Sequence, residues 1–240
     1  MPRPRIPDRP RVILDRARDL ILERGYDATT MAEIASRAGI GKGAIYREFD
    51  SKEALLDALL VRSMHGLTAR VRSGVEASRE PIGLSTAYRL GLDALFADPM
   101  MLAFYTADAR ILGTVLESRG PSRYGPRMDW LTAYVRELQR IGLVRADLDP
   151  ESASLMLSLV SVGLITGPAA LGDLSADRLR DVITLLTDTI ARAWECRTSE
   201  APVEASREAM VALLDRLDRQ LGRHLDGRPD RQPAVTGGSS

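Results

Sequence analysis

Apolar residues recur along this 240-residue chain at intervals of three and four positions, and almost nowhere in the alternating pattern of a half-buried strand. Alanine, leucine, arginine and glutamate dominate the composition, and all four are residues that favour helices. The pattern therefore predicts an all-α fold.

The first two predicted helices are short and have clear ends. One runs from Pro10 to Arg24, and Gly25 is placed where a glycine commonly ends a helix. The next runs from Met31 to Ala38. Thr30 stands before it as an N-cap, with Glu33 three positions on, which is the spacing of a capping box. Both ends are thus predicted from local hydrogen-bonding chemistry.

Only residues 39–41, Gly-Ile-Gly, separate the second helix from a third predicted at Lys42–Phe49. Two short helices joined by a three-residue turn that contains glycine are typical of a helix-turn-helix. Asp50 or Ser51 then caps a fourth helix that begins with Lys52.

Beyond about residue 73 the pattern changes to longer helices, interrupted where proline and glycine cluster. These helices are predicted at Leu84–Ala97, Met100–Leu116, Arg127–Gly142, Pro150–Thr166, Ala176–Arg197 and Val203–Leu225. We therefore expect a helix-turn-helix domain at 1–65, a ligand-binding and dimerisation domain at 66–200, an additional helix within 201–226 and a disordered tail at 227–240.

The segment 29–55 reads TTMAEIASRAGIGKGAIYREFDSKEAL. It resembles the DNA-binding domain of TetR-family repressors, in which a threonine-capped helix is followed by Ile-Ala, Ala-Gly at the turn, a tyrosine, a phenylalanine three positions on, and Ser-Lys-Glu-x-Leu. The matching positions are Thr30, Ile34, Ala35, Ala38, Gly39, Gly43, Tyr46, Phe49, Ser51, Lys52, Glu53 and Leu55. The resemblance implies a bacterial transcription regulator whose second domain binds a small molecule.

The same segment has the residue types that a DNA-binding element needs. Lys42, Gly43 and Ala44 give the third helix one cation and two small side chains, which let its end approach base edges in the major groove. Arg47 can donate to guanine or phosphate. The resemblance implies that Lys42, Gly43, Ala44 and Arg47 face bases, and that Thr30, Tyr46 and Lys52 contact the DNA backbone.

Two features near this segment leave alternatives open. Glu48 departs from the family pattern, so its carboxylate turns away from DNA, pairs with Arg47, or accepts from a cytosine amine; we favour the first two. Arg3, Arg5, Arg9 and Arg11 near the N-terminus either form an arm for the adjacent minor groove or are an idle basic tail.

The most distinctive C-terminal stretch is 152–172, which has twenty-one residues without a charge. Its serines, a proline and the lack of a second span argue against a membrane helix. Family architecture implies that this helix and the next pack against their copies in a homodimer, with no membrane partner. The candidate interface residues are Leu159, Gly163, Gly167, Leu186 and Ile190.

The family's effector cavity lies among the middle helices. An apolar small molecule suits aromatic and methionine side chains, although each candidate is also a plausible core residue. The candidates are Tyr88, Leu92, Met101, Phe104, Tyr105, Arg110, Met128, Trp130 and Met156, where Arg110 either meets an anionic group or pairs with Asp108 or Glu117. The helix at 203–225 is expected to pack on the dimer or extend its interface.

The composition limits the kinds of function that the chain can have. Formal net charge is zero, and only two of the 33 basic residues are lysines, both within the helix-turn-helix segment. One cysteine and two histidines predict no disulfide framework, metal site, cofactor or catalytic constellation, and so no enzyme. We expect a cytoplasmic homodimer that represses transcription from a palindromic operator until a largely apolar effector binds. The alternatives are a related regulator controlled by a protein partner, and an activator.

Overall fold

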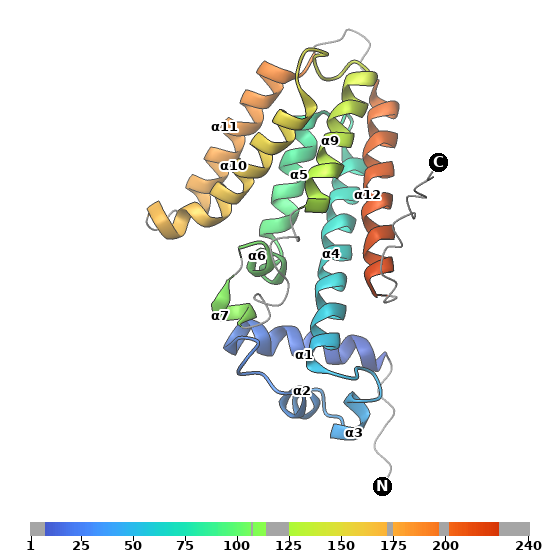
Figure 1. Cartoon of the computed structure of the whole chain (residues 1–240), viewed down its shortest axis with the longest axis vertical. Helices are drawn as coiled ribbons and strands as arrows, with labels where there is room; N and C mark the ends of the chain where they lie inside the picture. The colour runs from blue at the N-terminus through green and yellow to red at the C-terminus, as the bar shows by residue number, and fades with distance from the viewer. Residues whose placement is uncertain (1–7, 107, 114–124, 172–174, 197–201, 226–240) are drawn as a thin grey trace, which may run out of the picture.

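The computed structural model describes residues 8–106, 108–113, 125–171, 175–196 and 202–225. These residues form helices joined by short loops, and within them the only β-type pairing is an isolated bridge between Val144 and Glu195 (Figure 1). The all-α prediction is confirmed. The helices are α1 (Arg9–Arg24), α2 (Met31–Arg37), α3 (Lys42–Ile45), α4 (Lys52–Ala77), α5 (Leu84–Phe96), α6 (Pro99–Thr106), α7 (Ala109–Leu112), α9 (Gly125–Arg140), α10 (Pro150–Leu171), α11 (Ala176–Trp194) and α12 (Val203–Leu225).

The predicted ends of the first two helices are confirmed. Gly25 follows α1 with φ 85° and ψ 159°, a region that is nearly exclusive to glycine. Gly39 follows α2 with φ 68°; its N–H donates to the Ser36 carbonyl, and the next N–H, from Ile40, donates to the Ala35 carbonyl. These two bonds form a Schellman motif, which turns the chain toward α3 within three residues.

Two predicted helices are shorter than expected. The third was predicted at Lys42–Phe49, but α3 ends at Ile45, and the N–H groups of Glu48 and Phe49 both donate to the Ile45 carbonyl in the turn that follows. A single helix was also predicted at 100–116. This prediction is wrong because Asp108 interrupts the helix. The Asp108 carboxylate accepts from the N–H of Arg110, and this hydrogen bond starts α7 as a separate turn.

The ends of α10 and α11 also differ from prediction. α10 continues past Thr166 to Leu171, because Pro168 costs one backbone hydrogen bond but the three residues after it are good helix formers. α11 ends at Trp194 and not at 197. There the chain turns extended, and Glu195 bridges to Val144 while its carboxylate accepts from the N–H of Ser85 at 2.7 Å.

One long helix, α4, joins two hydrophobic cores. Its first turns bury Leu55, Leu56 and Leu59 against α1 and α2, together with residues of α6 and α7. Its last turns bury Val71 and Val75 against α5, α9, α10, α11 and α12. Figure 1 shows the small unit of α1 to α3 at one end of α4 and the larger bundle around the other end. The domain boundary near residue 65 stays a prediction.

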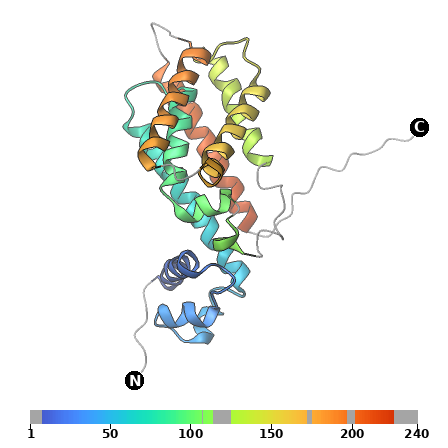
Figure 2. The ribbon, with the colours of Figure 1, turned by 90° about the vertical axis from the view of Figure 1, so that its left-hand side faces the viewer.

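The additional helix α12 packs on its own chain, against α4 and α9. Arg72 of α4 pairs with Asp215 at 2.8 Å, and Thr68 donates to Asp218 at 2.8 Å. Figures 1 and 2 place α12 on the side of the bundle opposite α10 and α11. It therefore lies away from those two helices, and its expected role in the dimer stays a prediction.

Candidate nucleic-acid interface

The candidate recognition element, α3, is a short turn of helix anchored by one buried residue. Ile45 is fully buried, and Gly41 starts α3 in an extended conformation. Lys42 and Arg47 are exposed, and Tyr46 has 43% of its surface exposed despite its size. Since the apolar anchor faces inward, the cationic and phenolic side chains are all presented to solvent.

The small residues predicted to face bases lie in the same turn. Gly43 is exposed and Ala44 is half-buried. Among the described residues, no atom beyond its chain neighbours and the backbone of its own helix lies within 4 Å of the position that a Cβ would take at Gly43. This end of α3 is therefore sterically open to close approach by another molecule, as the direct-readout prediction requires.

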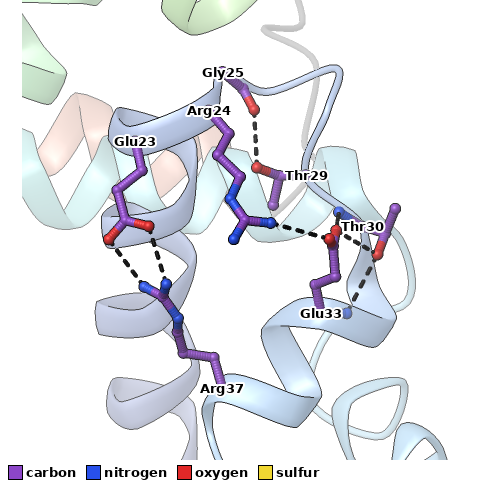
Figure 3. A network of polar contacts seen from close by, with 7 residues as sticks. All are labelled: Glu23, Arg24, Gly25, Thr29, Thr30, Glu33 and Arg37. Carbon is purple, nitrogen blue, oxygen red and sulfur yellow. Dashed lines mark hydrogen bonds and ion pairs between the residues drawn. The ribbon is translucent and has the colours of Figure 1, made fainter.

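Thr30 caps α2 through a reciprocal network (Figure 3). The N–H of Glu33 donates to the Thr30 hydroxyl oxygen at 3.2 Å, while the Thr30 hydroxyl and N–H donate to the Glu33 carboxylate at 2.8 and 3.0 Å. The Thr30 hydroxyl, then its N–H, and then the nearby Arg24 guanidinium lower the pKa of Glu33. The predicted capping box is confirmed, and the Thr30 hydroxyl proton is committed to it.

The same close-up shows how α1 holds α2. The two terminal nitrogens of Arg37, Nη1 and Nη2, donate to the two carboxylate oxygens of Glu23, at 2.9 and 3.0 Å. The buried Thr29 hydroxyl donates to the Gly25 carbonyl at 2.8 Å, which fixes the loop between the helices (Figure 3). Bidentate pairing of this kind adds geometric specificity, so α2 has a defined orientation on α1.

Lys52 lies at the first residue of α4 and points back into this loop. Its ammonium donates to the carbonyls of Tyr26 and Thr29, both at 3.0 Å, and lies 4.1 Å from the centroid of the Tyr26 ring. The Tyr26 hydroxyl donates to Glu53 at 3.3 Å. The predicted contact of Lys52 with a DNA phosphate therefore competes with three internal interactions.

Glu48 pairs with a residue that the sequence pattern did not single out as its partner. Its carboxylate accepts from Arg9 at 3.1 Å, with both side chains about one-quarter exposed. The favoured alternatives were a carboxylate turned away from DNA or a pair with Arg47. The observed partner is Arg9, so Glu48 joins the turn after α3 to the start of α1, and a carboxylate turned away from DNA stays a prediction. Arg9 and Glu48 are 39 positions apart, so no local spacing could have indicated the pair.

Comparisons with known proteins agree with this geometry. Residues 13–59 match the family described as bacterial regulatory proteins, tetR family. The chain is 30% identical, over 143 residues, to the HTH-type transcriptional repressor KstR2 of Mycobacterium tuberculosis, covering 57% of this chain and 70% of that one. The chain belongs to the TetR family.

Two solved structures share the fold of this chain. The fatty acid degradation regulator FadR from Bacillus halodurans superposes with a TM-score of 0.58 at 19% identity, over 79% of this chain and 98% of that one. AibR, solved with isovaleryl coenzyme A and operator DNA, gives 0.50 at 22% identity, over 74% and 97%. The family match and the sequence relatives, rather than these structures, identify this TetR-family protein as a DNA-binding transcription regulator, as predicted.

The DNA-binding unit of this TetR-family protein touches the bundle through α6 and α7. The N–H of Tyr26 donates to the Ile111 carbonyl at 2.7 Å. A Cβ at Gly25 would lie 2.4 Å from the Arg110 carbonyl oxygen, so only glycine allows this approach. Arg18 of α1 also reaches the buried carboxylate of Asp98 at 3.3 Å, and Asp98 caps the start of α6. These contacts join positions 80 to 85 residues apart, which sequence spacing does not reveal.

The nine effector-site candidates do not share one environment. Tyr88 and Leu92 are buried in the bundle core, and Trp130 packs against it half-buried. The Tyr88 hydroxyl donates to the Leu157 carbonyl at 2.9 Å and lies 2.6 Å from the Ser161 oxygen. Of four further candidates, Met101 is buried and Phe104 packs against the N-terminal core. The side chains of the other two, Tyr105 and Met128, lie outside the part of the chain that the structure describes.

Two effector-site candidates point outward. The Arg110 side chain is 90% exposed and donates to Asp108 at 3.0 Å, in line with the ion-pair alternative. Met156 is 47% exposed on α10. Because both side chains face solvent, neither shares an interior space with Tyr88.

Bulky apolar side chains are exposed along one side of the bundle. We call this surface the outer face; its residues are Leu155, Met156, Leu159 and Val162 of α10 and Val182 and Leu185 of α11, each at least 40% exposed. Both views place α10 and α11 on the same side (Figures 1 and 2). Helical spacing aligns these residues on one stripe of each helix.

The interface candidates relate to the outer face unequally. Leu159 is 64% exposed, and at Gly163 a Cβ would meet no atom within 4 Å. Gly167 and Leu186 are half-buried. Ile190 is 1% exposed within the core of its own chain, so it supports α11 from inside and does not lie on the outer face.

Two further predictions concern the described residues as a whole. Among them, no helix is both long enough and apolar enough to cross a membrane. Nor do histidine, cysteine and acidic side chains gather there in a group of three or more that could hold a metal ion. The predictions for Arg3, Arg5 and the tail at 227–240 lie outside the described residues.

Proposed function

We propose that this protein is a homodimeric repressor that binds a palindromic operator through α2 and α3 and releases it when an effector enters the bundle. The observation that carries the proposal is the presentation of Lys42, Tyr46 and Arg47 around the buried Ile45. An exposed ammonium and an exposed guanidinium, at a helix end that is open to close approach, suit the recognition of phosphate and guanine.

The outer face supports the dimer. A single α3 contacts too few base pairs for useful specificity, whereas a two-fold dimer reads two half-sites about 34 to 36 Å apart, or a multiple of that. Leu159 and Leu185 are 64% and 69% exposed, and exposed bulky apolar side chains on two helices at one side of the bundle support a protein interface there. Packing the outer face against its copy would form a four-helix interface.

We call α1 to α3 and the start of α4 the recognition unit. Effector release needs a connection between the bundle and the recognition unit, and α6 supplies one. This helix contacts α5 and α10 on one side and α1 and α4 on the other. An effector that favours one arrangement of α6 would bias the separation of the two recognition units. Such coupling is typically about 1 to 3 kcal/mol and is reciprocal, so operator DNA should weaken effector binding by the same factor.

The DNA-binding part is tested by selecting genomic fragments with the purified full-length chain and measuring the best site by fluorescence anisotropy. We expect a palindrome whose binding is lost when Lys42→Ala and Arg47→Ala are combined. Arg70→Ala is the matched control, since Arg70 is exposed on α4 about 27 Å along the helix from Lys52. Equal binding by all three proteins would contradict a role for α3 in DNA binding.

The effector part is tested by screening small apolar molecules for thermal stabilisation and then for release of the selected operator. A true effector raises the melting temperature by mass action and also dissociates the DNA. Molecules that do only the first are not effectors. If no library compound does both, control by a protein partner becomes the better explanation, and a reporter gene driven by the operator distinguishes repression from activation.

A further inference from the structure

Three interactions hold the ammonium group of the half-buried Lys52 against its own chain. It donates two hydrogen bonds of 3.0 Å to the carbonyls of Tyr26 and Thr29, and it lies 4.1 Å from the centroid of the buried Tyr26 ring. An ammonium has three N–H groups and no other hydrogen-bonding capacity. Two of the three are committed to these carbonyls, and the charge is also stabilised by the π-face of the ring.

The loop that Lys52 holds is a junction of three parts of the fold. Tyr26 follows α1, and its N–H donates to the Ile111 carbonyl of α7. Thr29 precedes Thr30, the N-cap of α2, and Lys52 itself begins α4. One side chain therefore ties the start of α4 to the loop that sets where α2 begins, at a point where α7 also touches.

We propose that Lys52 is a positioning residue for operator binding, which holds the loop 26–29 and through it α2, and that it does not neutralise a DNA phosphate. The inference rests on the proposed DNA-binding function. Moving out to a phosphate would require the ammonium to give up two charge-assisted hydrogen bonds and its place over the ring, and in its present place only its third N–H remains for DNA. Hydrogen bonds to a charged donor are about twice as strong as neutral ones, so the internal site competes well. Lys42, by contrast, is exposed on α3 and is available to DNA.

The salt dependence of operator binding separates the two roles. A lysine that neutralises a phosphate contributes about one to the slope of log Kd against log salt concentration, whereas a positioning residue contributes nothing to the slope. We would measure the full-length dimer by fluorescence anisotropy on its selected operator across a series of KCl concentrations. The variants are Lys52→Met and Lys42→Met, in which methionine keeps an unbranched stem and removes the charge.

We expect Lys52→Met to raise Kd by about tenfold or more at every salt concentration with the slope unchanged. We expect Lys42→Met to lower the slope, because removing a cation that lies against DNA reduces the release of counterions. A slope that falls equally in both variants would overturn the proposal. Failure of the unsubstituted protein to bind any operator would instead overturn the proposed function, so the two failures are distinguishable.

A second pair of measurements, on Lys52→Arg, tests the proposal even if Lys52→Met does not fold. Lys52→Arg keeps the charge, but its planar guanidinium cannot place one nitrogen between two carbonyls and over a ring in the same way. A phosphate contact survives this change, whereas a positioning role predicts weaker binding with the slope unchanged. Hydrogen exchange of residues 26–30 in the DNA-free Lys52→Arg protein should also be faster than in the unsubstituted protein. Unchanged affinity together with unchanged exchange would contradict the proposal.

Discussion

The side chains that α3 and its following turn present to solvent are lysine, tyrosine and arginine, whereas those that the middle of α10 presents are leucine, methionine and valine. Both surfaces belong to helices whose opposite side is anchored by fully buried residues, Ile45 in one and Leu157 in the other. The two helices are therefore anchored in the same way, by a buried apolar residue, and differ in the side chains that they expose. One exposes groups that suit a polyanion, and the other exposes groups that suit another apolar surface.

The difference extends to how each surface is held. The recognition unit is fixed by polar links: the Thr30–Glu33 capping box, the Arg37–Glu23 pair and the Lys52 ammonium. The outer face is carried by long helices packed through apolar side chains onto α5 and α9. A surface made of short helices needs specific polar contacts, because four to seven residues cannot bury enough area to hold their own position.

The strongest way to break the comparison is to make the outer face charged. Leu159→Asp combined with Leu185→Asp should reduce the dimer to a single chain of 26.3 kDa, because each subunit would bury two carboxylates without partners. We expect the dissociation constant of the dimer to rise by about a hundredfold or more, since central interface residues commonly contribute 2 kcal/mol or more each. Sedimentation equilibrium measures the mass.

The matched control is Ala212→Asp, which adds a carboxylate at an exposed position of α12, away from the outer face. It should remain dimeric. If the doubly substituted protein keeps the mass of the control, α10 and α11 do not form the interface. Operator affinity should fall together with the dimer, because two half-sites are read only by two subunits.

A second prediction sharpens how the recognition unit is attached. Gly25→Ala should lower the free energy of unfolding by about 3 kcal/mol, because φ 85° with ψ 159° is unfavourable for alanine and its Cβ would lie 2.4 Å from the Arg110 carbonyl oxygen. Gly39→Ala should cost only about 1 kcal/mol, because its φ of 68° is also strained but no atom lies within 4 Å of the new Cβ.

The two glycine variants control each other, since both add one methyl group at positive φ. Urea titration at one protein concentration gives the difference, and the concentration must be fixed because dimerisation contributes to stability. Equal costs would mean that the approach of α7 to Gly25 relaxes easily. The contact between the recognition unit and the bundle would then be looser than the structure indicates.

How much of this was predictable differs between the two regions. In the recognition unit the decisive chemistry is local: Thr30 and Glu33 are three positions apart, and Gly39 follows the last helical residues directly. Capping and turn signals of that range are legible in a sequence. The helix starts at Met31, Lys42 and Lys52 were accordingly predicted correctly.

The contacts that were missed join distant positions. Arg18 pairs with Asp98 across 80 positions, and Arg9 pairs with Glu48 across 39. Periodicity gives the face of a helix but not its neighbour, so Ile190 and Leu159 could not be separated into inward and outward residues in advance. Asp108 was also missed as a helix start, because an acid within an apolar run does not by itself distinguish a break from an exposed position.

A third prediction concerns the acid in the recognition turn. If Arg9 keeps the Glu48 carboxylate away from phosphates, Arg9→Gln should weaken operator binding about threefold to tenfold, and less when Glu48→Gln is also present. The coupling should be about 0.5 to 1 kcal/mol, because both side chains are partly exposed. Fluorescence anisotropy on the four proteins of the cycle measures it. Additive effects would show that Arg9 contributes to DNA binding independently of Glu48.

The smallest expected effect concerns the Thr30–Glu33 capping box and tests whether it forms in solution. The pKa of Glu33 is lowered mainly by the Thr30 hydroxyl, so Thr30→Val should raise it toward the ordinary glutamate value of about 4.3. A depressed carboxyl pKa stabilises the fold above that ordinary value, and the stabilisation is lost as pH falls through the lower folded-state pKa. The variant should therefore show a flatter loss of stability in acid.

Titration of the Glu33 side-chain carboxyl by carbon-13 NMR measures this shift directly. Arg24→Gln is the matched control: Arg24 lies 3.3 Å from the same carboxylate but lowers its pKa less than either Thr30 hydrogen bond does, so its rise should be smaller. If Thr30→Val left the pKa unchanged, the capping box would not hold in solution. The Thr30 hydroxyl would then be available to a DNA phosphate, as the family resemblance implies, and α2 would depend on Arg37 and Lys52 for its orientation.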